Sequence, residues 1–343
     1  MSHAWRSRLA QTARAALLAA LGVVVCSAGT LLYFVAMPGQ SHGEALPPPT
    51  PAEQGAAREL ERHVRALAVD IGERRALTGH SLERAEQYLQ AELSAIAAGS
   101  GAKLRREAVP APGAPGNWVL DVPGVQAGPT VLIGAHYDTA PEGTPGANDN
   151  GSGSAATLVL AARLAPKRHR LPLRFVLFVN EEMPYFQTPQ MGAWVHARGC
   201  QERGEELRAM LSLETMGYYS DEPGSQKYPP PLDAFYPDRG NFIAFVGNVS
   251  SRALVRESIA LFRRHATIPS EGGALPSGLP GVGWSDHWAF WQHGYAAVMV
   301  TDTALFRDPT YHRNSDVASN LDYARLGRVV VGLEQVIAAL ASG

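Results

Sequence analysis

The chain has 343 residues, of which 45% are hydrophobic and 18% are charged, and its formal net charge is −2. This length fits one large domain or two small ones with a good core, and the charge argues against a nucleic-acid partner. The two cysteines do not suggest a disulfide framework and are too few for a cysteine-based metal site, so any metal must be held by His, Asp and Glu.

The N-terminal region predicts a membrane anchor. Residues 15–37 form a stretch of 23 residues without a charge, and about 20 apolar residues suffice to span a bilayer as a helix. Three arginines lie within residues 1–14, and the next Lys or Arg is Arg58. By the positive-inside rule, we expect residues 1–14 in the cytosol, a transmembrane helix at 15–37, and the rest of the chain on the periplasmic or extracellular side.

A cleaved signal peptide is the main alternative for this region, but its apolar core usually has about 7–15 residues. A buried core helix is a third possibility, which the length and the one-sided arginines disfavour. The proline-rich segment that follows, residues 38–52, predicts a linker that separates the membrane from a domain at 53–343.

The body of the chain alternates between helix and strand patterns. Apolar residues at helical spacing predict helices at 56–69, from 81 onward, and at 152–164, 191–199, 251–265, 286–293 and 323–341. Residues 103–109 and 117–122 are expected to be strands, and short apolar runs predict further strands at 130–135, 173–179, 209–213, 242–246 and 296–300. This order predicts an α/β domain with a mixed, mostly parallel central sheet and helices on both faces. Two long loops, 217–240 and 267–284, interrupt the alternation, and such loops are usually functional or disordered.

Side chains that can bind metal follow the predicted strands, where α/β folds build their sites. In chain order these residues are His136, Asp138, Asp149, Glu181, Glu182, Glu214 and His312. A hydrolytic site with two metal ions needs about three protein ligands per ion, one of them shared, and a base that activates water. Imidazoles and carboxylates suit zinc. If a turn aims both adjacent glutamates into one cleft, one can bind metal and the other can move protons.

The order His-x-Asp, Asn-Asp, Glu-Glu, Glu and a late His resembles the M28 family of zinc aminopeptidases, and the resemblance covers roughly residues 55–340. It implies two Zn²⁺ ions, with Asp149 bridging them. His136 and Glu214 would complete the first zinc site, and Glu182 and His312 the second.

The same resemblance implies two supporting roles. Glu181 would be the general base, and Asp138 would orient the histidine two residues before it. The sequence departs from the family at Glu214, where Asp is frequent, and at Arg313, where Thr is frequent. Asp316 lies four residues after the late histidine, as the family pattern expects.

Other candidate residues have less support from the sequence. Ser285, Asp286 and His287 resemble a family segment near the pocket that carries no metal ligand, so we expect His287 to start a helix or line the pocket. Four tyrosines are candidates, by position only, for stabilising the oxyanion of the reaction: Tyr218, Tyr219, Tyr295 and Tyr311.

The predicted activity is the removal of N-terminal residues from peptide substrates, with one zinc polarising the scissile carbonyl and the other holding the free α-amine. A glutaminyl cyclase-like enzyme with one zinc is an alternative on the same scaffold. A catalytically silent ectodomain that binds peptides or a partner is another, which the intact Glu181 disfavours. The sequence reveals neither the preferred N-terminal residue nor the oligomeric state.

Overall fold

A computed structural model describes residues 14, 18 and 22 and residues 29–343, except 76–79, 114 and 142. The chain divides into two units, Met1–Ala36 and Met37–Gly343. In the first unit, residues 29–35 are helical. The predicted cytosolic segment and most of the predicted anchor at 15–37 lie outside the described residues. Among the residues that are described, no helix has the length and apolar character needed to cross a membrane.

The second unit is built on one sheet with the strand order β1-β2-β4-β3-β5-β8-β6-β7. The strands are β1 Lys103–Ala108, β2 Gly116–Val122, β3 Thr130–His136, β4 Leu173–Phe178, β5 Leu207–Glu214, β6 Ile243–Asn248, β7 Ser270–Leu275 and β8 Ala297–Thr301. Strand pairs β3–β4, β3–β5, β5–β8 and β6–β7 are parallel, whereas β1–β2, β2–β4 and β6–β8 are antiparallel. The prediction of a mixed sheet is confirmed.

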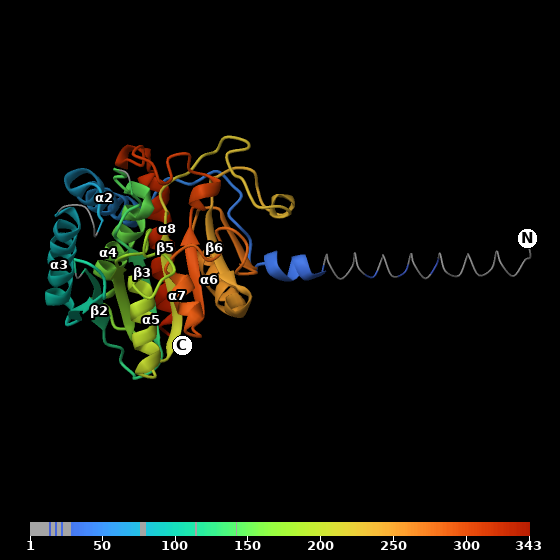
Figure 1. Ribbon diagram of the computed structural model, residues 1–343. Helices are drawn as coiled ribbons and strands as arrows, with labels where there is room; N and C mark the ends of the chain where they lie inside the picture. The colour runs from blue at the N-terminus through green and yellow to red at the C-terminus, as the bar shows by residue number, and fades with distance from the viewer. Residues whose placement is uncertain are drawn as a thin grey trace, which may run out of the picture. The chain divides into compact units, whose positions relative to one another are not determined.

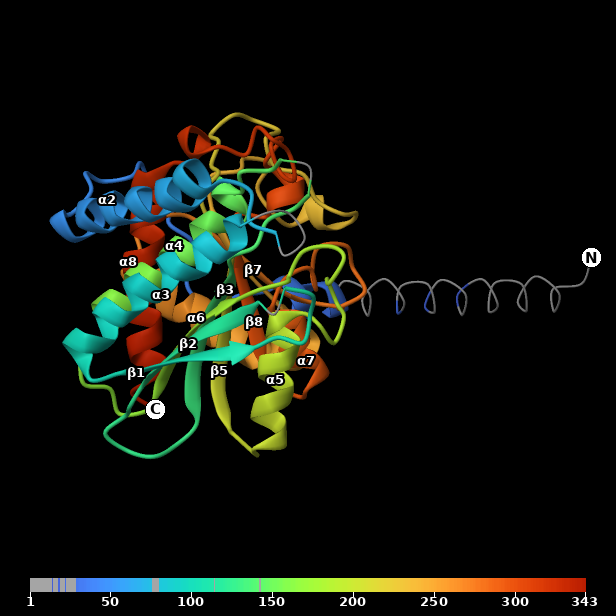
Figure 2. The same ribbon diagram turned by 60° about the vertical axis from the view of Figure 1, so that its left-hand side comes forward.

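Helices cover both faces of this sheet (Figures 1 and 2). They are α2 Pro51–Arg65, α3 Ser81–Ser100, α4 Gly153–Leu164, α5 Gly192–Glu202, α6 Arg252–His265, α7 His287–Gln292 and α8 Tyr323–Leu340. The large core joins one face of the sheet to α2, α3, α4, α6 and α8. A smaller core joins the other face to α5 and α7. Helices α5 and α7 leave β6 and β7 without a helix on that second face, which matters for the pocket described below.

The strand β7 lies inside the predicted loop 267–284, so that part of the prediction is wrong. Its sequence, Ser270-Glu-Gly-Gly-Ala-Leu275, has no apolar run and two glycines, which are depleted in strands. A side chain at Gly272 would come within 2.9 Å of Cδ1 of Ile259 on α6, so the helix packs closely onto this strand. The strand is therefore defined by its pairing with β6 and by helix packing.

The predicted linker, 38–52, lies along the domain rather than extending freely. Arg263 donates from Nη1 to the backbone oxygen of Pro38 at 3.1 Å. The backbone N–H of Ser270, at the start of β7, donates to Oγ of Ser41 at 2.8 Å. Helix α2 begins before the predicted end of the linker. This segment thus packs along the edge strand of the sheet.

Candidate metal centre

Five of the predicted residues converge where β3, β4 and β5 end. His136, Asp149 and Glu214 offer ligand atoms that all lie within 4.8 Å of one another, and Asp149, Glu182 and His312 form a second such group. The two groups share only Asp149. The sequence therefore predicted correctly which side chains meet, although they are up to 176 positions apart in the chain.

The shared aspartate directs one oxygen to each group. Asp149 Oδ1 lies 3.4 Å from His136 Nε2, and Asp149 Oδ2 lies 3.0 Å from His312 Nε2. His136 Nε2 is also 3.2 Å from Glu214 Oε2, and His312 Nε2 is 3.4 Å from Glu182 Oε1. Two buried oxygens at this centre, Asp149 Oδ2 and Glu182 Oε1, have no hydrogen-bond donor among the described residues. Buried carboxylate oxygens without a donor fit a site that binds cations.

Acidic groups are crowded at this centre, and burial shifts their pKa values. Burial, with the charge of Asp149, raises the pKa of Glu182 to about 7, and burial raises the pKa of Glu214. Burial lowers the pKa of His312, but its interactions with the facing carboxylates of Asp149 and Glu182 outweigh it and raise that pKa to about 11. Without a cation, the centre therefore retains protons. A divalent cation would displace them, because it stabilises the carboxylates and binds neutral imidazole.

Asp138, which follows the end of β3, connects this strand end to Glu181 and Glu182. Its two carboxylate oxygens accept the backbone N–H groups of Glu181 at 3.1 Å and Glu182 at 3.0 Å. Asn180, just before them, has a positive φ of 60°, which creates the turn that lets both glutamates face the centre. The contact predicted for Asp138 is weaker, since its Oδ1 lies 3.5 Å from Nδ1 of His136. The aspartate thus mainly fixes the backbone of the glutamate turn.

Further contacts fix the loop that carries the shared aspartate. Asp316 accepts the backbone N–H groups of Asn148 at 2.8 Å and Asp149 at 3.0 Å. Asn150 donates from Nδ2 to the carbonyl of Leu213 at 2.9 Å, one residue before the ligand that ends β5. These contacts hold the loop against the end of β5 and against the segment after His312.

Arg74 is an important residue that the sequence did not indicate. It is fully buried and donates to the backbone oxygens of Tyr137 at 2.7 Å, Pro145 at 2.7 Å and Gly146 at 2.8 Å. One guanidinium therefore joins the end of β3 to the loop leading to Asp149. The charged stretch around residue 74 looks like a surface segment, and no spacing pattern distinguishes the buried arginine.

The Ser-Asp-His segment lies beside the centre without joining either ligand group. Ser285 donates from Oγ to Oε2 of Glu214 at 2.6 Å. Helix α7 begins at His287, whose Nε2 is 2.8 Å from the carbonyl of Val282. Asp286 is completely buried, and burial raises the pKa of its carboxyl well above its ordinary value.

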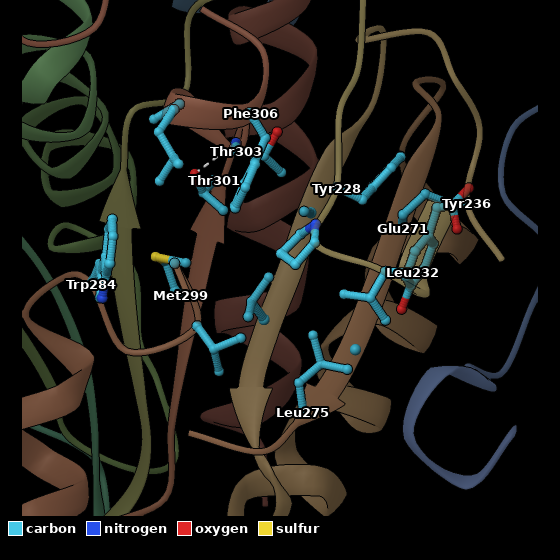
Figure 3. Close-up of a pocket in the computed structure, with 18 of the residues that line it drawn as sticks. Tyr228, Leu232, Tyr236, Glu271, Leu275, Trp284, Met299, Thr301, Thr303 and Phe306 are labelled. Carbon is cyan, nitrogen blue, oxygen red and sulfur yellow. Dashed lines mark hydrogen bonds between the residues drawn. The ribbon is translucent and has the colours of Figure 1, made fainter. Parts of the chain in front are cut away.

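The four candidate tyrosines occupy different places, and Tyr218 donates its backbone N–H to Oδ2 of Asp302 at 2.8 Å. Tyr219 donates its hydroxyl to the carbonyl of Met216, and Tyr295 donates to the carbonyl of Glu205. Tyr311 stacks on His312 with ring centroids 3.9 Å apart. Tyr311 also borders, together with Glu214, an apolar trough that extends from the centre over β8, β6 and β7 (Figure 3). Of the four, Tyr311 is the one stacked on a ligand side chain.

Comparisons with known proteins agree with this arrangement. Residues 117–337 match the family described as Peptidase family M28. The uncharacterized protein YfbL of Escherichia coli K12 is 35% identical over 293 residues, which cover 83% of this chain and 88% of that protein. A probable leucine aminopeptidase of Arthroderma otae is 27% identical over 62% of this chain and 54% of that protein. The chain thus spans about half the length of that fungal relative.

Solved structures share the fold. LapB of Legionella pneumophila has a TM-score of 0.70 at 16% identity, covering 90% of this chain and 79% of that chain. The LapA aminopeptidase of the same organism has a TM-score of 0.67 at 18% identity, with 85% and 74% covered. A glutaminyl cyclase of Bacteroides thetaiotaomicron has a TM-score of 0.61 at 16% identity, with 85% and 99% covered. At these identities the similarity establishes the fold alone.

Proposed function

Because the chain belongs to peptidase family M28 and is a peptide hydrolase, we propose that it is a two-zinc aminopeptidase. The observation that carries this proposal is the pair of ligand groups that share Asp149. The fungal relatives named as leucine aminopeptidases support the choice of an exopeptidase.

The donor atoms suit zinc in type and in spacing. His136, Asp149 and Glu214 would hold one ion, and Asp149, Glu182 and His312 the other. Donors at about 2.0–2.1 Å from one tetrahedral zinc lie about 3.3 Å from each other. The separations between histidine and carboxylate atoms in the two groups are 3.0–3.4 Å. When bound, the two ions would polarise the scissile carbonyl and lower the pKa of the attacking water.

We propose Glu181 as the general base. Its Oε2 lies 3.8 Å from His136 Nε2, at the edge of the first ligand group. Burial and the neighbouring glutamates raise the pKa of Glu181 well above its ordinary value, although His136 opposes the shift. A carboxylate with a raised pKa accepts a proton from water and returns it to the leaving amine more readily at neutral pH. The backbone of this glutamate is fixed by Asp138.

Tyr311 is our candidate for stabilising the oxyanion. Its ring lies between His312 and the trough, and burial raises the pKa of its hydroxyl, so the hydroxyl remains a donor at neutral pH. A donor aimed at the developing oxyanion accelerates acyl transfer substantially.

The test is hydrolysis of aminoacyl nitroanilides by the purified protein, with metal content measured in parallel. We expect activity that a chelator abolishes and zinc restores, no cleavage of N-acetylated substrates, and about two zinc ions per chain. One zinc per chain together with cyclisation of N-terminal glutamine would establish the cyclase alternative. Zinc binding without any turnover would favour the silent ectodomain.

We also propose that residues 15–37 anchor the protein in a membrane, with the catalytic domain outside the cytosol. The support is the uncharged length and the arginines that precede it. Resistance of the membrane-bound protein to carbonate extraction, with the domain digested by protease added from outside, would agree. Release of a shorter chain into solution would favour a cleaved signal peptide.

A further inference from the structure

The chain is held to the catalytic domain from the last residue of the uncharged stretch 15–37 onward. That residue, Met37, packs against the large core, and its Cγ would lie 3.2 Å from a side chain placed at Gly272 of β7. The backbone oxygen of Gly39 accepts a hydrogen bond from Nη1 of Arg263 at 3.1 Å. The stretch 15–37 is therefore joined to the domain directly at the edge strand of the sheet.

A turn between β5 and β6 contacts the same residue of β7. The hydroxyl of Tyr236 donates to the backbone oxygen of Gly272 at 2.8 Å. Tyr236 also stacks on Tyr228 with ring centroids 5.6 Å apart, and the Tyr228 hydroxyl donates to the carbonyl of Pro237 at 2.6 Å. These contacts fix residues 229–237, which we call the proline turn. Both ribbon views show this turn, in gold, on the side of the domain where the blue chain enters (Figures 1 and 2).

The proline turn has an inner and an outer face. Its inner residues Pro229, Leu232 and Tyr236 line the trough (Figure 3). Its exposed residues do not line the trough, and five of them are apolar: Pro230, Pro231, Ala234, Phe235 and Pro237. The side chain of Phe235 is 39% exposed. Exposed apolar residues that are grouped rather than scattered mark contact surfaces, so the outer face of the turn is a candidate for one.

The backbone of the proline turn is suited to leaving water. Four of its nine residues are prolines, which have no N–H group. The N–H groups of Leu232, Ala234 and Phe235 donate to carbonyls within the turn at 3.0–3.2 Å. In a lipid environment each backbone group without a partner is costly. These paired groups would therefore lose little on contact with lipid.

The charges around the turn balance one another. Lys227 and Arg239 flank it, Asp233 and Asp238 lie within it or next to it, and all four are exposed. The net charge of residues 227–239 is thus zero. Attraction to anionic headgroups needs an excess of basic side chains. The composition therefore favours an apolar contact over an electrostatic one.

We infer that the outer face of the proline turn lies in the interfacial layer of the membrane, with the side chain of Phe235 among the lipids. This inference rests on the proposed anchor at residues 15–37. That anchor ends at Met37, and the interfacial layer on each side of a bilayer is about 5–8 Å thick. Met37 and Tyr236 meet the same residue of β7, and Phe235 is one position, about 3.8 Å, further along the chain. The lipid surface is therefore within reach of the turn.

The experiment places an environment-sensitive fluorophore (NBD) on the turn of the full-length protein in phosphatidylcholine vesicles. Ala234→Cys carries the label and leaves Phe235 in place. Cys26→Ser removes the cysteine of the proposed anchor, and Cys200 is buried. We expect the emission to shift to the blue and to be quenched by lipids that carry bromine on their acyl chains. Asp233→Cys is a second label position in the same turn, should Ala234→Cys fail to fold.

A label at Val125→Cys is the matched control. Val125 is 60% exposed and follows β2, which is six strand spacings, about 29 Å, from β7 in the sheet. Brominated lipid should leave its emission unchanged. In the protein labelled at position 234, adding Phe235→Asp should abolish the quenching, because a charge resists entry into lipid. Adding Val125→Asp there should leave the quenching as it was.

Each other outcome overturns a defined statement. Emission at position 234 that brominated lipid does not change, in protein that resists carbonate extraction, would refute the inference and leave the anchor intact. A blue shift without lipid quenching would also refute it and would indicate a protein partner or a second copy. Quenching that requires phosphatidylglycerol and disappears at high salt would refute the apolar contact. Release of the protein from the vesicles by carbonate would refute the anchor itself.

Discussion

Asp316 accepts the backbone N–H of Asp149 at 3.0 Å, across 167 positions of the chain. We predict that Asp316→Asn weakens metal binding about 10- to 100-fold, because partners of this kind orient metal ligands. The asparagine amide would place an N–H group against a backbone N–H. Chelator competition measures the affinity, and Asp233→Asn, on an exposed loop, is the control. Equal affinities in the two variants would show that this contact does not position the shared ligand.

Glu181→Gln should separate metal binding from catalysis. Glu181 belongs to neither ligand group, so the variant should retain the metal content of the wild type. Loss of the general base should lower kcat about 10²- to 10⁴-fold. Steady-state kinetics and metal analysis on the same preparation test both statements. A variant with near-wild-type turnover would remove Glu181 from the mechanism.

Arg74→Lys should destabilise the fold strongly. Lysine cannot reproduce the fork that donates to Tyr137, Pro145 and Gly146, and buried hydrogen bonds to a charged group contribute about 1.5–3 kcal/mol each. We therefore expect a loss of about 3 kcal/mol or more in urea unfolding of the metal-free protein. Arg75→Lys is the matched control, since the neighbouring side chain is 20% exposed and pairs with Glu73 at 3.6 Å. Comparable losses in the two variants would contradict the role given to Arg74.

Acid should weaken the fold through a pair that belongs to neither ligand group, Glu107 and His196. Burial raises the pKa of Glu107, but the hydrogen bond from His196 at 2.9 Å outweighs it and lowers that pKa to about 2. Burial also lowers the pKa of His196. Both groups bind fewer protons in the folded state than in the unfolded one, so stability falls as pH drops below about 6.5 and further from about 4.5 toward 2.

The glutamate contribution to this loss is roughly 3 kcal/mol, because the pKa of Glu107 falls from its ordinary value of 4.5 to about 2 on folding. Urea unfolding between pH 2 and pH 6 measures it. Glu107→Gln should flatten the profile in the lower part of this range. An unchanged slope in that variant would assign the acid sensitivity to other groups.

The meeting of the five candidate metal ligands could be predicted from the sequence because they come after apolar strands, and strand ends of a parallel sheet meet at one edge. The contacts that hold these residues in place could not be predicted from the sequence. Arg74 acts through backbone oxygens, which any residue supplies, so no partner can be recognised in the sequence. The fixing of the glutamate turn by Asp138 depends on the positive φ of Asn180, which a pattern of side chains does not reveal.

The trough was not predicted for a related reason. Its floor includes β7, whose two glycines gave no strand signal, although Gly273 is what makes room for Tyr236. The length of the trough follows from the register in which four strands pair. That register depends on how the strands pair with one another, which the sequence of each strand does not reveal. The sequence located the long 217–240 loop but not its shape.

The segment from Pro38 to Ser41 bonds to Arg263 on α6 and to Ser270 at the start of the edge strand. A version of the chain shortened at its N-terminus therefore has to retain the segment from Pro38 to Ser41 to keep these contacts. A version that began at α2 would free the backbone N–H of Ser270 at the start of β7, and exposed strand edges recruit strands from other molecules. Such a shortened protein should self-associate through β7, at the edge of the sheet.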